Sequence, residues 1–158
     1  MDTSRSTPRS LLIRTLRLVL GLFLLATGVG KALDMRGFVV VIDTYQMGLS
    51  PDLEWIAALA VTAVEFVLGA WLLSGWRTAI AASASALLQG FYFLVLSITL
   101  ARGVDVPNCG CFGVFFARPL RIGTLVEDLV LVALLVGLAA LSLQRRRRPG
   151  GAFQSISD

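Results

Sequence analysis

The sequence predicts an all-α protein, a four-helix transmembrane bundle with both termini in the cytoplasm. Hydrophobic residues make up 56% of the 158 residues and charged residues only 15%, and the apolar residues gather into four long runs. A helix needs about 20 apolar residues to cross about 30 Å of hydrocarbon. The predicted helices cover residues 11–33, 53–74, 79–100 and 125–143. Because they occupy more than half of the chain, we expect one membrane domain over residues 11–144 and no separate soluble domain.

Basic residues give the expected orientation. Nine of the 14 basic residues lie before or within the start of the first run, in the turn after the second, or after the fourth. They are Arg5, Arg9, Arg14, Arg17, Arg77 and Arg145–Arg148. Cytoplasmic segments of membrane proteins carry such an excess, so both termini are expected inside and the loops 34–52 and 101–124 outside. The net charge of +4 then reflects a stop and orientation signal first and contact with anionic lipid second, and no nucleic-acid partner is expected.

Both ends of the chain are polar. Residues 1–10 and the basic segment 145–158 are expected to be disordered tails. The first apolar run follows a basic start, as in a signal peptide, but it is long and lacks an Ala-x-Ala cleavage site. We therefore expect it to be retained as the first transmembrane helix.

Two further segments carry interpretable patterns. Residues 38–42 are apolar but too few to span a membrane, so we interpret them as a short helix at the membrane interface, with Tyr45 at headgroup depth. The predicted helix 79–100 has a polar stripe that includes Gln89 and Tyr92; these two residues and Tyr45 are candidates for lining a ligand site. A second stripe on this helix is typical of close helix–helix packing. Its small residues are Ala79, Ser83, Ala86, Gly90 and Ser97.

Four of the ionisable residues within the predicted helices are candidates for chemistry. Glu65 lies near the middle of helix 53–74, where a carboxylate must face the bundle interior, take a proton or pair with a cation. Lys31 lies one turn inside the outer end of the first helix, and Glu127 and Asp128 have a similar depth in the fourth. We expect Lys31 to reach Glu127 or Asp128 more easily than Glu65. Proton handling, polar contact to a bound small molecule and structural ion pairing all stay open for these residues.

Cys109 and Cys111 are the only cysteines, one residue apart in the second outer loop. A Cys-x-Cys disulfide closes a small strained ring, and strained or exposed disulfides are the reactive ones. A bond between such close neighbours closes almost no loop and so stabilises little. Gly110 supplies the backbone freedom that the ring requires, and the nearby Arg118 favours a thiolate. The pattern therefore favours thiol–disulfide exchange over a static disulfide.

Metal binding is the other chemistry open to two thiols. A closed zinc site requires four ligands, whereas this chain has no histidine and no third cysteine, so no metal site is predicted. Two thiolates can hold Cu(I), so a copper-handling or transport protein stays as an alternative.

These motifs together resemble the MauE family, the methylamine-utilisation membrane proteins within the DoxX-like redox-associated group. The resemblance spans most of residues 16–143. Its motifs are Gly28-Val29-Gly30-Lys31, then Phe38 and Tyr45, then Glu65, and finally Cys109-Gly110-Cys111-Phe112-Gly113.

The resemblance implies a multi-pass protein of the bacterial inner (plasma) membrane, with the cysteine loop on the extracytoplasmic side. Such a protein takes part in maturing or exporting the disulfide-rich small subunit of methylamine dehydrogenase, beside a periplasmic thioredoxin-like partner. The broader group is similar to membrane oxidoreductases that pass thiol electrons to a quinone.

Our leading hypothesis is a membrane thiol–disulfide relay, and thus a candidate oxidoreductase, in which Cys109 and Cys111 react. Lys31, Glu65, Glu127 and Asp128 would provide proton or polar support, with quinone as a candidate cofactor. The other alternative is a non-enzymatic assembly or anchoring subunit of a larger membrane complex.

Overall fold

The structure, a computed structural model, describes residues 8–115 and 117–146. This part of the chain contains five α-helices and no strand. They are α1 (Pro8–Leu33), α2 (Met35–Asp43), α3 (Pro51–Ser74), α4 (Thr78–Ala101) and α5 (Ile122–Arg146). All except α2 are long and apolar enough to cross a membrane. The described residues thus confirm an all-helical fold with four candidate membrane spans, while the side faced by the termini stays a prediction.

The long helices extend beyond the predicted apolar runs. α1 begins at Pro8 and α5 ends at Arg146, so helix continues into the segments expected to be tails. Proline suits the first turn of a helix, and glutamine and arginine are good helix formers at the far end. Hydropathy marks only the part of a helix that contacts hydrocarbon, which is shorter than the helix itself. The rest of the predicted tails lies outside the described residues.

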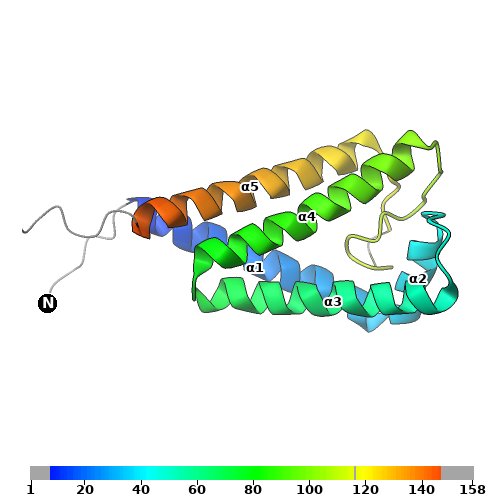
Figure 1. The fold of residues 1–158 in the computed structure, drawn as a ribbon, viewed down its shortest axis with the longest axis horizontal. Helices are drawn as coiled ribbons and strands as arrows, with labels where there is room; N and C mark the ends of the chain where they lie inside the picture. The colour runs from blue at the N-terminus through cyan, green and yellow to red at the C-terminus, as the bar shows by residue number, and fades with distance from the viewer. Residues whose placement is uncertain (1–7, 116, 147–158) are drawn as a thin grey trace, which may run out of the picture.

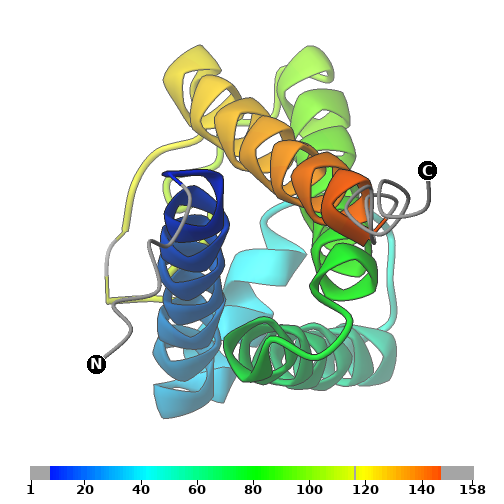
Figure 2. The same cartoon turned by 90° about the vertical axis from the view of Figure 1, so that its left-hand side faces the viewer.

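The four long helices form two pairs. α1 packs chiefly against α3, and α4 packs chiefly against α5. α3 and α4 are joined by the short turn 75–77 and separate toward the opposite end, where α2 and the segment 102–121 lie between them (Figure 1). Seen along the bundle, α2 occupies the interior among the four long helices (Figure 2). We refer to the end with the turn 75–77 as the closed end and to the end with α2 and residues 102–121 as the cysteine end.

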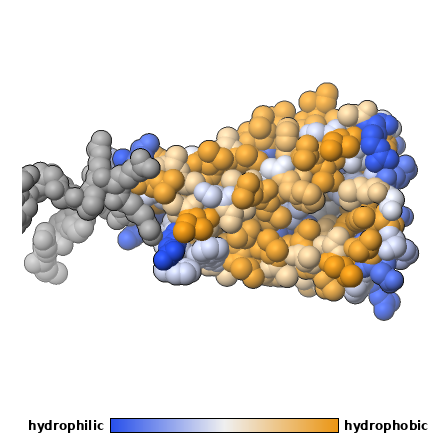
Figure 3. Space-filling model, viewed as in Figure 1, coloured by the Kyte–Doolittle hydropathy of each residue, from blue (hydrophilic) through white to orange (hydrophobic). Residues whose placement is uncertain are grey.

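The surface matches a membrane location. An apolar band covers the middle of the bundle, and hydrophilic residues gather at both ends (Figure 3). Large apolar side chains such as Leu22, Val67 and Leu87 are exposed on this band. In a bilayer they contact hydrocarbon instead of water.

α2 differs from the predicted interfacial helix. It begins after Asp34, whose carboxylate accepts a hydrogen bond from the Gly37 amide at 2.9 Å. Phe38 and Ile42 of α2 are buried, and Tyr45 just beyond it is only 8% exposed. Tyr45 therefore packs inside the protein and not on its surface, while its depth relative to the headgroups stays a prediction. α2 turns inward because the separation of α3 and α4 leaves an apolar space that its side chains fill.

The face that α4 buries differs in part from the prediction. Ala79 of the predicted packing stripe is buried, but so are Ala81, Ala82, Ser85 and Gln89 outside it, whereas Ser83 of that stripe is exposed. A methyl group added at Gly90, another member of that stripe, would meet nothing within 4 Å. Both faces of α4 carry small residues at helical spacing, so spacing alone did not identify the packed one.

Candidate functional site

The Cys-Gly-Cys loop lies directly on α1 through backbone contacts. A Cβ atom at Gly113 would lie 2.5 Å from the carbonyl oxygen of Gly30, and one at Gly30 would lie 2.6 Å from that of Phe112. Gly113 also has a φ of +66°, a conformation that favours glycine. Glycine is therefore needed on both sides of this contact.

Hydrogen bonds within the loop fix its shape. The Asn108 side chain accepts from the Gly110 amide at 3.0 Å and donates to the Gly113 carbonyl at 3.0 Å. The Cys109 amide donates to the Arg118 carbonyl at 2.8 Å. Sequence reasoning overlooked Asn108, although asparagine commonly bonds to the backbone of a following turn.

The two thiols are free and lie side by side. Their sulfur atoms are 3.3 Å apart, and a disulfide bond is about 2.05 Å long, so the sulfurs need to approach by only about 1 Å to bond. Gly110 between them has a φ of +67°. Cys109 is buried, with 6% of its surface exposed, whereas Cys111 is partly exposed. Of the two residues, Cys111 is therefore the one with more exposed surface.

The thiols differ in acidity. The hydrogen bond from the Cys111 thiol lowers the pKa of Cys109 from 9.0 to about 6, with a smaller contribution from the positive charge of Arg118 and some opposition from burial. The pKa of Cys111 is raised, chiefly because its proton is shared with Cys109 and also because of burial. At neutral pH the pair is thus a buried Cys109 thiolate that accepts a hydrogen bond from a Cys111 thiol.

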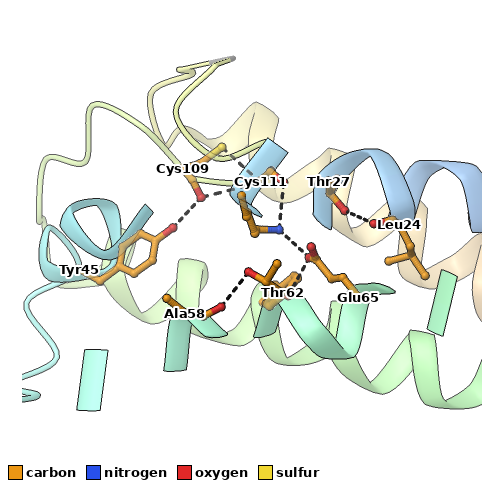
Figure 4. Close-up of polar contacts among 10 residues, drawn as sticks. Leu24, Thr27, Tyr45, Ala58, Thr62, Glu65, Cys109 and Cys111 are labelled. Atoms are coloured by element: carbon orange, nitrogen blue, oxygen red, sulfur yellow. Dashed lines mark hydrogen bonds and ion pairs between the residues drawn. The ribbon is translucent and has the colours of Figure 1, made fainter. Parts of the chain in front are cut away.

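Side chains from α1 and from the residues after α2 hold the backbone of both cysteines. The Tyr45 hydroxyl donates to the Cys109 carbonyl at 2.6 Å (Figure 4). The Lys31 ammonium donates to the Cys111 carbonyl at 3.1 Å. The pKa of Tyr45 is raised by burial and by the neighbouring thiols, so it remains a phenol and a hydrogen-bond donor.

A buried ion pair lies beneath the loop. The Lys31 ammonium is 2.6 Å from a Glu65 carboxylate oxygen, and their side chains are 3% and 1% exposed. The Tyr92 hydroxyl donates to the same oxygen at 2.8 Å. Figure 4 shows Glu65 pointing from α3 toward the two cysteines.

The expectation that Lys31 pairs more easily with Glu127 or Asp128 is therefore wrong. Since α1 packs chiefly against α3, the Lys31 side chain meets Glu65. A buried carboxylate without water attracts the nearest cation strongly. Glu127 instead binds Arg118 on the surface, with the closest N–O distance at 2.6 Å.

Asp128 has a different environment from the ion pair. It is 5% exposed, and its Oδ2 atom has no hydrogen-bond partner among the described residues. Its negative charge acts on both thiols, where it raises the pKa of each. Asp128 is thus close to the sulfurs but on a different helix from Lys31 and Glu65.

A cavity lies on each side of the cysteine loop, and both cysteines line both cavities. The first, here called the charged cavity, has a volume of about 420 Å³. Its lining includes Phe23, Phe112, Arg118, Glu127 and Asp128. The second, here called the apolar cavity, has a volume of about 310 Å³. Its lining includes Lys31, Phe38, Tyr45, Phe91, Tyr92 and Val95.

The structure thus gathers most of the predicted site residues around the sulfurs. Tyr45 and Tyr92 line the apolar cavity, whereas the buried Gln89 lines neither cavity. Phe91 was not predicted, because one aromatic residue in an apolar helix gives no signal of a ligand site. Within residues 8–115 and 117–146, no group of three or more His, Cys, Asp or Glu side chains is arranged to hold a metal ion.

The fold and this site define a class: a multi-pass membrane protein with a thiol pair above a buried ion pair. The family model described as "Methylamine utilisation protein MauE" matches residues 9–142. The chain therefore belongs to the MauE family, and the resemblance seen in its motifs is confirmed. No curated protein and no solved structure matches the chain.

Proposed function

We propose that this MauE-family protein is a membrane thiol–disulfide exchange protein, and that its Cys109–Cys111 disulfide oxidises the thiols of a thioredoxin-like partner or a disulfide-rich client. The observation that carries this proposal is the pair of sulfur atoms 3.3 Å apart, which belong to one buried and one partly exposed cysteine. Two thiols at this distance interconvert with a disulfide through a small movement of a loop that is otherwise held in place.

The two cysteines have different roles in this exchange. A thiolate of the partner attacks the Cys111 sulfur, the Cys109–Cys111 bond breaks, and Cys109 leaves as a thiolate. A second thiolate of the partner then attacks the partner sulfur of the mixed disulfide. Cys111 leaves and takes up a proton, the partner becomes a disulfide, and two electrons have passed to the Cys109–Cys111 pair.

The acidity of the thiols supports this direction. A leaving thiol with a low pKa departs faster, and Cys109 has a pKa of about 6. A disulfide whose reduced form is stabilised is a stronger oxidant, and the hydrogen bond with Cys111 stabilises the Cys109 thiolate, because it lowers the pKa of Cys109. Both effects favour electron flow from the partner to this protein.

The charged cavity is the proposed approach route for the partner. It contains both sulfurs, and it has Arg118 and Glu127 on its exposed side, with side chains 51% and 53% exposed. A guanidinium close to the sulfurs favours the arrival of a partner thiolate. The opposite cavity is lined mainly by apolar side chains, which suit a protein partner's thiol less well.

The proposed location is the bacterial inner membrane, with the cysteine end on the extracytoplasmic side. The predicted cytoplasmic excess of arginine supports this orientation, since Arg9, Arg14, Arg17 and Arg77 belong to the half of the bundle that ends at the turn 75–77. An oxidising compartment lets a disulfide persist. The family description supports a client from methylamine utilisation, and the disulfide-rich small subunit of methylamine dehydrogenase fits the proposed chemistry.

Trapping of mixed disulfides tests the proposal. In the Cys109→Ser variant, the Cys111 thiolate can attack the disulfide of the oxidised partner, which releases one partner thiolate, but it cannot go on to form the internal disulfide. We therefore expect this variant to hold a partner in cells as a disulfide-linked complex. The Cys111→Ser variant retains only the buried cysteine and is expected to capture at least tenfold less. Complexes would be collected after acid quenching and alkylation, and separated without reductant.

The matched control is the double variant Cys109→Ser/Cys111→Ser, which must capture nothing. If neither single variant forms a mixed disulfide, exchange is the wrong chemistry. If the double variant also retains full function in cells, an anchoring role replaces the proposed one.

A further inference from the structure

Asp128 lies on the face of α5 that lines the charged cavity. Thr124, Asp128 and Leu131 follow one another at intervals of four and three residues, so they share one face of the helix, and all three line this cavity. Cys109 and Cys111 line it from the loop. The carboxylate and the two thiols therefore border the same space of about 420 Å³, which is the proposed approach route for the partner.

Asp128 differs from the other ionisable residues around the sulfurs because it has no ion-pair partner among the described residues. Lys31 is bound to Glu65 and Arg118 to Glu127, each with a closest N–O distance of 2.6 Å, so both nearby cations are paired with other carboxylates. Asp128 is only 5% exposed, and nothing in the described part of the chain forms a hydrogen bond with its Oδ2 atom. Ion pairing between helices therefore does not explain this carboxylate.

The charged and titratable groups that face Asp128 come from four parts of the molecule. They are Lys31 on α1, Glu127 on α5, Cys109, Cys111 and Arg118 in the loop, and Tyr45 after α2. The helix α4, which packs chiefly against α5, has no acidic or basic residue. The cations stay paired and Tyr45 stays a phenol, so a thiol is the group with which Asp128 can exchange a proton.

The negative charge of Asp128 does not by itself favour the exchange. It raises the pKa of both thiols, so it opposes the hydrogen bond that makes Cys109 a good leaving group. It also repels a partner thiolate that enters the cavity. If the carboxylate instead takes the proton of a partner thiol, the repulsion disappears and the attacking thiolate forms at the same moment. Proton transfer is thus the way in which this residue can assist the reaction.

We propose that Asp128 carries the proton of thiol–disulfide exchange in the charged cavity: it takes the proton of the partner's attacking thiol and returns it to Cys111. This inference rests on the proposed function, because it assigns a role within that exchange. It separates Asp128 from Lys31, Glu65 and Glu127, which are held in ion pairs.

The proton completes one cycle during the exchange. In the first step, the partner thiol gives its proton to Asp128 as its sulfur bonds to Cys111, and Cys109 leaves as a thiolate. In the second step, the other partner thiol, which has lost its proton to solvent, attacks the partner sulfur of the mixed disulfide. Cys111 leaves and takes the proton from Asp128, which is again a carboxylate. The partner is now a disulfide, two electrons have passed to the cysteine pair, and the product is the Cys109 thiolate beside the Cys111 thiol.

Reduction of the Cys109–Cys111 disulfide by dithiothreitol tests this inference. The oxidised protein in nanodiscs is mixed with excess dithiothreitol at pH 6.5 to 9, quenched with acid and alkylated, and the free thiols are counted by mass. Without a proton acceptor, the rate follows the thiolate fraction of the reagent, which falls about tenfold per pH unit below the pKa of a free thiol, about 8.5. Because Asp128 lets the neutral thiol react, we expect the rate of the unchanged protein to fall less than threefold per unit between pH 8 and 6.5.

Asp128→Asn removes the proton acceptor but keeps the size of the side chain. Its rate should fall about tenfold per pH unit, as the thiolate fraction does, and should be at least tenfold below that of the unchanged protein at pH 6.5. The difference should shrink to threefold or less at pH 9, where much of the reagent is ionised. Charge alone predicts the opposite sign, because loss of the carboxylate lowers the pKa of both thiols and admits a thiolate more easily. Asp128→Glu retains a carboxyl group and should retain the shallow pH dependence.

Asp105→Asn is the matched control. Asp105 lies in the segment 102–121, as the cysteines do, but it is exposed and lines neither cavity. This variant loses the same charge at the same end of the bundle, and it should react within twofold of the unchanged protein at every pH. Circular dichroism should give the same spectrum for all variants, since Asp128→Asn breaks no ion pair of the described residues.

The inference is overturned if Asp128→Asn reacts as fast as the unchanged protein at pH 6.5 or faster, or if Asp105→Asn is slowed to the same extent. The proposed function is judged separately, by the capture of a partner in cells by the Cys109→Ser variant. If a partner is captured while Asp128→Asn keeps the unchanged rate, the proposed function stands and only the proton route is wrong. If no partner is captured, the proposed function fails whatever the pH dependence.

Discussion

The closed end and the cysteine end of the bundle are built from the same four long helices but are packed in different ways. At the closed end, apolar side chains meet directly. The cluster there includes Leu20, Leu24, Leu72, Ala81, Ala82 and Leu138. At the cysteine end, α3 and α4 have separated, and α2 with the loop 102–121 fills part of the space (Figure 1). Two cavities and a buried ion pair occupy the rest.

This difference shows how a small membrane protein can hold a polar site. Helices in a bilayer gain no hydrophobic stabilisation from leaving lipid, so close packing must hold them together. The closed end provides that packing and allows the helices to diverge beyond it. The polar groups of the cysteine end then bind one another in the space between the helices.

The largest expected effect is on the stability of the cysteine end. Replacing Lys31 by Met leaves the Glu65 carboxylate without its cation, and breaking a buried ion pair typically costs about 3–5 kcal/mol. The double variant Lys31→Met/Glu65→Met should recover much of this loss. Unfolding of each variant in mixed micelles, followed by circular dichroism, measures both. If Lys31→Met, Glu65→Met and the double variant are equally stable, the pair does not hold α1 to α3.

A smaller effect is expected at the closed end. Leu72 is fully buried there, and truncation to alanine leaves a cavity. We expect Leu72→Ala to lower the free energy of unfolding by about 2–3 kcal/mol, at the low end of the range for Leu→Ala. The loss is small because a leucine exposed by unfolding within lipid contacts hydrocarbon and not water. Thiol exchange should stay within twofold of the unchanged protein. A large loss of exchange in Leu72→Ala would show that the two ends are coupled.

The next effect tests how the loop is held. Gly113→Ala places a methyl group 2.5 Å from the Gly30 carbonyl oxygen and forces alanine into a φ of +66°. Gly103→Ala has the same type of backbone conformation, with a φ of +71°, but nothing lies within 4 Å. Each backbone change costs about 1–2 kcal/mol. Only Gly113→Ala should also slow thiol–disulfide exchange with a partner, by at least fivefold. Equal exchange rates in the Gly113→Ala and Gly103→Ala variants would contradict the contact between the loop and α1.

The smallest effect on stability is a dependence on pH at the thiol pair. Because the pKa of Cys109 falls from 9.0 to about 6 in the folded protein, the reduced protein gains stability as pH rises from about 6 to 9 and loses it as pH falls through 6. Thiolate absorbance at 240 nm should therefore show one transition near pH 6. Cys111→Ala removes the hydrogen bond and should move this transition upward. A single transition above pH 8 in the unchanged protein would contradict the assignment.

Most residues of the site could be predicted from the sequence, but which of them form an ion pair could not. Cys109, Cys111, Lys31 and Glu65 are unusual for their setting, since thiols occur as a close pair and charges lie within apolar helices. Their partners depend on which helices are neighbours. Depth along the helix axis placed Lys31 beside Asp128, whereas the packing of α1 on α3 joined it to Glu65.

The position of α2 inside the bundle could not be predicted from the sequence either. Its apolar residues suited both a membrane surface and a protein interior, and only the divergence of α3 and α4 decided between them. The same divergence brings the Tyr45 hydroxyl within hydrogen-bond distance of the cysteine loop. The role of Asn108 could have been predicted from its position before a turn, whereas nothing in the sequence around Phe91 indicates that it lines a cavity.

The sequence by itself determined the helical class, the four membrane spans, the closeness of the two thiols and the family. Each of these follows from local properties: hydrophobic length, residue spacing and a short motif. Only the tertiary structure decided which charges pair, which cysteine is more exposed and that a cavity lies on each side of the cysteine loop. These properties depend on the angles and contacts between helices, which side chains far apart in the sequence set together.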